Sequence, residues 1–162
     1  MKIIFVFIDG FGLGVEDKQK NPLYSAKMPN FLRMMEQYTL IPTDATLGVP
    51  GLPQSATGQT TILTGKNAPQ ILGKHLHGQP TVTLKKLIYQ YSLFKILKEK
   101  GIKVTNANVY SDQYLEAIQN PSERKLRPSA STVACMAAGI PLRTVEDLKR
   151  GNGLYHDITN DI

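Results

Sequence analysis

Residues 2–8 read KIIFVFI and lead directly into DGFG at residues 9–12. A segment that is apolar on both faces and rich in Ile, Val and Phe is typical of a central parallel strand. In open α/β sheets, ligand and metal sites form at the carboxyl ends of such strands, where the strand holds a side chain rigidly. Asp9 follows the segment directly. It is therefore a candidate metal ligand.

The rest of the chain predicts helices separated by two further strands. Pro42 would confine a strand at residues 38–45 to a sheet edge, and residues 102–109 are typical of a second parallel strand. Thr144 and Asp147 have the spacing of a capping box. This order predicts an α/β fold, a mostly parallel sheet flanked by helices, in a single domain over residues 1–162. Helices are expected at residues 29–37, 55–64, 83–89, 93–100, 112–118, 131–138 and 145–150, with a turn at 69–72.

Composition narrows the class of partner. The 162 residues are 41% hydrophobic, enough for one core, and the net charge of +6 suits an anionic partner. The charge is thinly spread, the chain has no Trp, and no binding motif is present, so nucleic acid is not an expected partner. The apolar start is interrupted at Asp9, too early for a signal peptide or a membrane span. We therefore expect a cytoplasmic protein with no membrane partner.

The single cysteine, Cys135, lies in the small-residue run STVACMAA at residues 131–138. One cysteine cannot form an internal disulfide. Its neighbours are apolar rather than electropositive, which favours a buried structural thiol over a nucleophile.

A second motif, QSATGQ at residues 54–59, precedes TTILTG at residues 60–65. It places the hydroxyls of Ser55 and Thr57 at the start of a short helix, which Gly65 would end. A helix N-terminus and a metal both favour the alkoxide of a hydroxyl nucleophile. The backbone amides of residues 56–58 would cradle a phosphate, and Gly58 would let a substrate approach closely. With Asp9, this motif predicts metal-assisted phosphoryl chemistry.

A third segment, GKHLHG at residues 73–78, carries two of the three histidines of the chain. His75 and His77 have the spacing of a two-histidine metal pair on a strand. In a loop among Gly and Pro, the interpretation as a substrate-contacting or exposed segment is favoured, with Lys74 available to an anionic substrate.

Asp9-Gly10-Phe11-Gly12 after an apolar strand, and Ser55-Ala56-Thr57-Gly58 before a helix ending in Leu63-Thr64-Gly65, resemble the amino-terminal half of the alkaline phosphatase superfamily. The closest branch contains cofactor-independent phosphoglycerate mutase and phosphopentomutase. The resemblance spans about residues 1–110. It implies that Asp9 binds a metal and that Ser55, three residues before the motif glycine, forms the phosphoenzyme and also touches the metal. Thr57, Gly58, Lys74, His75 and His77 are then the expected substrate-binding residues.

The resemblance also implies two divalent metal ions (Mn, Zn or Mg) and a phosphorylated small-molecule substrate. The chain departs from the mutase pattern in two ways. Gln59 replaces the His that follows the motif glycine, and the Asp and His ligands of the carboxyl-terminal half are absent. We therefore expect this chain to be the amino-terminal part of a larger metalloenzyme, a phosphomutase or phosphatase, and to be inactive by itself. The alternative is a non-catalytic α/β phosphate-binding module.

Overall fold

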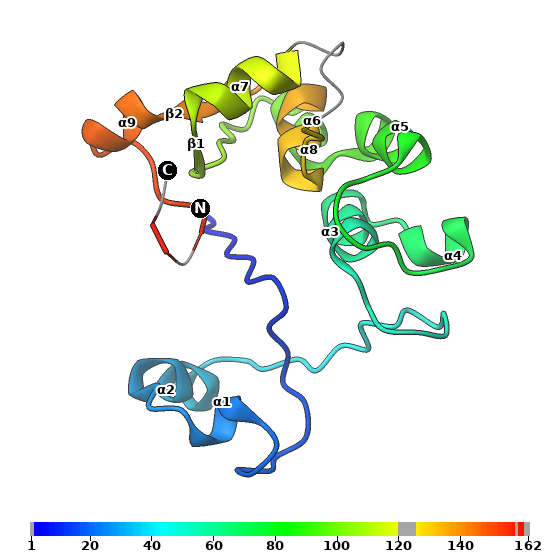
Figure 1. Cartoon of the computed structure of the whole chain (residues 1–162), viewed down its shortest axis with the longest axis vertical. Coiled ribbons are helices and arrows are strands. Elements are labelled where there is room, and N and C mark those ends of the chain that lie inside the picture. The colour runs from blue at the N-terminus through cyan, green and yellow to red at the C-terminus, as the bar shows by residue number, and fades with distance from the viewer. Residues whose placement is uncertain (1, 120–125, 158, 161–162) are drawn as a thin grey trace. The chain divides into compact units, whose positions relative to one another are not determined.

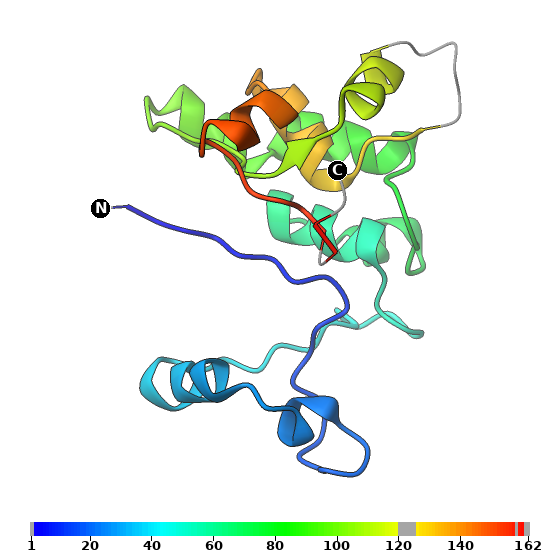
Figure 2. The ribbon, with the colours of Figure 1, turned by 60° about the vertical axis from the view of Figure 1, so that its left-hand side comes forward.

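The chain forms two compact units, residues 1–45 and residues 46–162. The computed structural model describes residues 2–119, 126–157 and 159–160. Figure 1 shows the whole chain, and Figure 2 shows the same ribbon turned.

The first unit contains two helices, α1 (Pro22–Ser25) and α2 (Pro29–Gln37). The side chain of Asn21 accepts a hydrogen bond from the Leu23 amide at 3.1 Å and so caps α1. The predicted helix at residues 29–37 is confirmed, and it begins with Pro29 in its first turn, where the missing amide costs nothing. The Phe11 ring packs edge-on against Phe31 of α2, with ring centres 5.1 Å apart.

Residues 2–8 do not form the predicted strand. Every side chain from Ile3 to Ile8 is exposed, by 90% at Ile4 and by 43% at Phe7. A strand exists only through hydrogen bonds to a neighbouring strand, and the structure records no such ladder for this segment within the described residues. The predicted edge strand at residues 38–45 is also absent, for the same reason. Hydrophobic pattern alone therefore did not determine these elements.

The second unit is mostly helical. The predicted helices are confirmed with shifts of a few residues, and the predicted turn at residues 69–72 is a short helix. The helices are α3 (Ser55–Thr64), α4 (Ala68–Leu72), α5 (Val82–Tyr91), α6 (Leu93–Glu99), α7 (Asp112–Gln119), α8 (Ala130–Ala138) and α9 (Val145–Lys149). None of the helices in the described part of the chain has the length and apolar character needed to cross a bilayer.

The core of this unit lies where α3, α5 and α8 meet. Leu63 of α3 and Ile88 of α5 pack against Val133 of α8, and each is at most 6% exposed. Ala130 and Ala134 complete this cluster. Small side chains on α8 leave room for the larger residues of the other two helices, so the three helices approach closely. Both ribbon views show α8 beside α6, and the two helices are in contact.

The sheet is smaller than predicted. In the described residues it consists of β1 (Val109–Tyr110) paired in parallel with β2 (Arg143–Thr144). Val109 lies opposite Arg143, and Asn108 makes one further bridge to Leu154. The class is therefore mixed α/β, but the described residues do not form the expected large parallel sheet. Residues 102–108, which were predicted as strand, pair with no other described residue apart from that bridge, so they run as an irregular segment.

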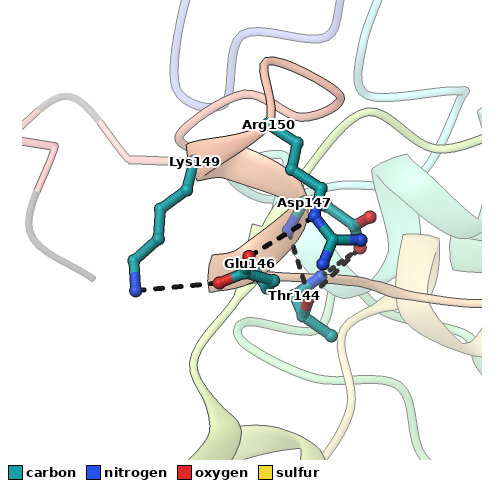
Figure 3. Close-up of polar contacts among 5 residues, drawn as sticks. All are labelled: Thr144, Glu146, Asp147, Lys149 and Arg150. Atoms are coloured by element: carbon teal, nitrogen blue, oxygen red, sulfur yellow. Dashed lines mark hydrogen bonds and ion pairs between the residues drawn. The ribbon is translucent and has the colours of Figure 1, made fainter.

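The predicted capping box at the start of α9 is confirmed (Figure 3). The Asp147 amide donates to the Thr144 hydroxyl at 3.3 Å, and the Thr144 amide donates to the Asp147 carboxylate at 2.9 Å. These two bonds satisfy backbone donors that a helix start leaves unpaired. Glu146 also pairs with Lys149 at 3.8 Å and with Arg150 at 3.3 Å on the exposed side of the helix.

Candidate functional site

Asp9 lies in a tight turn that directly follows segment 2–8. The Phe11 amide donates to the Ile8 carbonyl at 3.4 Å, and Gly10 has a φ of 70°. Positive φ at the third residue of such a turn favours glycine. Asp9 is exposed and belongs to the first unit, whereas Ser55 belongs to the second. The pairing of these two residues at one metal therefore stays a prediction.

Ser55 is the first residue of α3, as the sequence predicted. Gln54 precedes the helix in extended conformation and makes no side-chain cap, and Ser55 itself is half-buried. Gly65 ends the helix with a φ of 67°, where its amide reaches the Thr61 carbonyl at 2.8 Å. The predicted position of the hydroxyl at the start of a short helix is thus confirmed.

Thr57 is completely buried, and its hydroxyl bonds to the backbone of neighbouring residues. Its hydroxyl donates to the Gln54 carbonyl at 3.2 Å and accepts from the Leu76 amide at 3.3 Å. Both of these bonds link the first turn of α3 to the chain around it. The expected substrate-binding residue is therefore enclosed within the protein rather than presented at its surface.

The predicted phosphate cradle is largely occupied by the protein itself. The Ala56 amide donates to the Leu76 carbonyl at 3.1 Å, and the Gly58 amide donates to the Gln54 carbonyl at 2.9 Å. An amide that already donates to a carbonyl has little left to offer an anion. This arrangement does not favour the alternative of a module that binds phosphate through these amides.

Gly58 is half-buried, but a Cβ built on it would meet no atom within 4 Å apart from its chain neighbours and the backbone of its own helix. Crowding therefore does not require glycine at this position. A glycine inside a helix costs about 0.5–1 kcal/mol relative to Ala. An unfavourable residue without a packing reason is consistent with the close approach of a ligand to this part of α3.

Segment 74–77 runs along the start of α3. Lys74 is exposed, and its amide donates to the Pro69 carbonyl at 3.0 Å. His75 is half-buried, and its Nε2 bonds to the Val49 carbonyl at 3.0 Å. His77 is exposed, and its Nδ1 bonds to Gln54 Oε1 at 3.1 Å. Each histidine thus has one ring nitrogen engaged with the chain that leads into Ser55.

The loop at residues 46–54 holds features that the sequence did not reveal. Leu47 has a φ of 54°, a conformation that side-chain-bearing residues rarely adopt. The side-chain amide nitrogen of Asn67 donates to the Leu47 carbonyl at 2.9 Å. The side-chain oxygen of Asn67, Oδ1, accepts from the Gln70 amide and so caps α4. The Pro and Gly residues of the loop gave a signal for irregular structure, but no local pattern identifies these distant partners.

A separate polar cluster lies beside β1. The buried Thr132 hydroxyl donates to the Tyr110 hydroxyl at 3.3 Å and bonds to the Tyr114 hydroxyl at 3.2 Å. Burial raises the pKa of Tyr110. Cys135 is buried, as predicted, and this burial raises the pKa of its thiol to about 11, so the reactive thiolate is scarce.

A metal would find few ligands in the described part of the chain. No group of three or more His, Cys, Asp or Glu side chains there is arranged to hold an ion. Asp9 in the first unit and Ser55 in the second each carry a hard oxygen donor of the kind that suits Mg or Mn. Comparisons of the chain with protein-family models, with curated proteins and with solved structures gave no match.

Proposed function

We propose that the chain takes part in metal-dependent phosphoryl transfer or hydrolysis through a phosphoserine at Ser55. The observation that carries the proposal is the place of Ser55 at the first position of α3, one helical turn before Gly58, where a Cβ would meet no neighbouring segment. The resemblance of DGFG and SATG to an alkaline-phosphatase-like mutase or phosphatase adds to it. The finer fold expectation, an alkaline-phosphatase-like parallel sheet flanked by helices, belongs to the same proposal.

In the first step, Ser55 Oγ attacks the phosphorus of a phosphate ester. The Oγ–P bond forms while the bond from phosphorus to the ester oxygen breaks, and the hydroxyl proton passes to the departing oxygen through solvent. In the second step, the oxygen of water or of another substrate hydroxyl bonds to phosphorus, the Oγ–P bond breaks, and the proton of the attacking group passes through solvent to Ser55 Oγ. Water makes the protein a phosphatase, and a substrate hydroxyl makes it a mutase.

The helix start supports the first step electrostatically. The aligned peptide dipoles of α3 place partial positive charge at its N-terminus, which favours the alkoxide form of Ser55 and the negative phosphoryl group. Exposed Lys74 would attract an anionic substrate. A divalent ion, when bound by Asp9, Ser55 and further ligands, would neutralise charge on the phosphoryl oxygens.

The test is direct detection of the phosphoserine in protein purified from the cells that produce it. The protein is incubated with phosphate esters and Mn, Zn or Mg, and peptides containing residue 55 are analysed by mass spectrometry. Ser55→Ala should abolish the phosphopeptide and the turnover. Ser25→Ala is the matched control, because Ser25 is an exposed serine of α1 whose hydroxyl makes one weak contact, to the Pro22 carbonyl at 3.5 Å.

Gly58→Ala sharpens the same test because it separates stability from function. The substitution has space and improves helix propensity, so it should raise the free energy of unfolding by about 0.5–1 kcal/mol. It should also slow phosphorylation of Ser55, because the methyl group occupies the surface where substrate approaches. A stabilised variant with full activity would contradict the role given to Gly58, and turnover that survives Ser55→Ala would contradict the proposal.

A further inference from the structure

We propose that His75 is a positioning residue, which fixes the loop at residues 46–54 and thereby sets the position of Ser55. This inference rests on the function proposed for Ser55. It replaces the substrate contact that the sequence predicted for His75 with a contact to the protein's own backbone. His75, the loop and Ser55 all belong to the second unit.

The bond between His75 and Val49 fixes which ring nitrogen carries the proton. Val49 contributes a carbonyl oxygen, which can only accept, so His75 Nε2 must donate across the 3.0 Å separation. The ring is half-buried, and its Cδ2 lies 3.4 Å from a Cβ built on Gly51. The imidazole therefore packs on the loop at Gly51 as well as bonding to it.

The loop needs such support because its backbone is unfavourable at Leu47. Leu47 with a φ of 54° persists only where surrounding contacts hold it. Two side chains from later segments supply those contacts, Asn67 at the Leu47 carbonyl and His75 at the Val49 carbonyl. We call this pair, Asn67 and His75, the loop latch.

The latch is connected to Ser55 through the backbone. Leu76 follows His75, accepts from the Ala56 amide at 3.1 Å and donates its own amide to the Thr57 hydroxyl at 3.3 Å. The same short segment therefore holds both the loop before Ser55 and the helix turn after it. A shift of about 1 Å in a reacting group lowers rates about 100-fold, so this support affects chemistry without contacting substrate.

The experiment compares His75→Ala with His75→Gln, whose side-chain amide can donate from a position similar to Nε2. His75→Ala should lower kcat for phosphoryl transfer by about 10–100-fold with little change in KM, and His75→Gln should recover most of that loss. His156→Ala is the matched control, because His156 also bonds to a backbone carbonyl, that of Val109, at 2.9 Å. It should leave kcat within about twofold of the unmodified protein.

A second readout does not depend on activity. Hydrogen exchange at the Val49 amide, which donates to the Thr46 carbonyl at 3.0 Å, should be faster in His75→Ala and in Asn67→Asp than in His156→Ala. Asn67→Asp removes the donor to Leu47 but keeps the oxygen that caps α4.

The outcomes separate the two proposals. A rise in KM with kcat unchanged would overturn the positioning role and restore substrate contact. Unchanged hydrogen exchange of the Val49 amide in His75→Ala would also overturn it. If the unmodified protein forms no phosphoserine, the function proposed for Ser55 fails, while the exchange data still decide whether the latch holds the loop.

Discussion

Segment 2–8 and helix α8 are both rich in apolar residues, but their surroundings differ. Ile4 is 90% exposed, whereas Val133 and Ala134 of α8 are at most 1% exposed. A helix satisfies its backbone hydrogen bonds internally, so α8 needs only side-chain partners to become buried. A strand also needs a neighbouring backbone. Hydrophobicity favours burial in both segments, and the available partners decide whether burial occurs.

The largest effect should come from removing an isoleucine side chain from the core against which α8 packs, compared with removing one from segment 2–8. Ile88→Ala leaves a cavity beside Leu63 and Val133 and should lower the free energy of unfolding by about 2–5 kcal/mol. Ile4→Ala removes an exposed side chain and should change it by no more than about 0.5 kcal/mol. Urea unfolding of both variants measures the difference. If both variants lost the same free energy of unfolding, segment 2–8 would be packed as tightly as the core. The comparison between the two regions would then fail.

A smaller effect is expected at the short sheet, where a strand does have a partner. The Leu154 amide donates to the Ala107 carbonyl at 2.8 Å, and a Cβ on Gly153 would overlap the Val109 side chain. Gly153→Ala should lower the free energy of unfolding by about 1–3 kcal/mol because β1 must shift. Gly12→Ala is the control, since its Cβ meets nothing within 4 Å. If the two variants unfold at the same urea concentration, the packing against β1 contributes little.

The smallest effect is expected at α9 and depends on pH. The pKa of Asp147 lies below its usual range, first because its carboxylate accepts the Thr144 amide and further because Arg143 and Arg150 are near. A lowered pKa in the folded state stabilises the protein above the unfolded value of about 3.9. That contribution is lost as pH falls through the folded value.

Asp147→Asn should therefore lower the melting temperature at pH 7. Near pH 3 the melting temperatures of the variant and the unmodified protein should differ less. Thermal melting at the two pH values tests this. A difference that grows on acidification would contradict the sign.

Local signals in the sequence predicted more than long-range ones. The start of α3 at Ser55, its end at Gly65 and the capping box of Thr144 and Asp147 depend on residues within a few positions of each other, and all three were predicted correctly. The strands were not, because a strand requires partners that periodicity does not specify.

The candidate site follows the same division. The position of Ser55 was predictable, whereas the bond from His75 to Val49 joins residues 26 positions apart and leaves no local pattern. Thr57 and the amides around it were expected to face a substrate. Their engagement by Leu76 became visible only when segment 74–77 was placed beside α3.

The order of the core helices has a consequence during protein synthesis. Leu63 and Ile88 leave the ribosome well before Ala130, Val133 and Ala134, with which they share a cluster. Until α8 emerges, the nascent chain carries α3 and α5 with the apolar surface that α8 covers in the finished protein still facing water. Chaperones that bind exposed apolar segments can therefore bind α3 and α5 during this interval. The interval ends when α8 has emerged and packed against these helices.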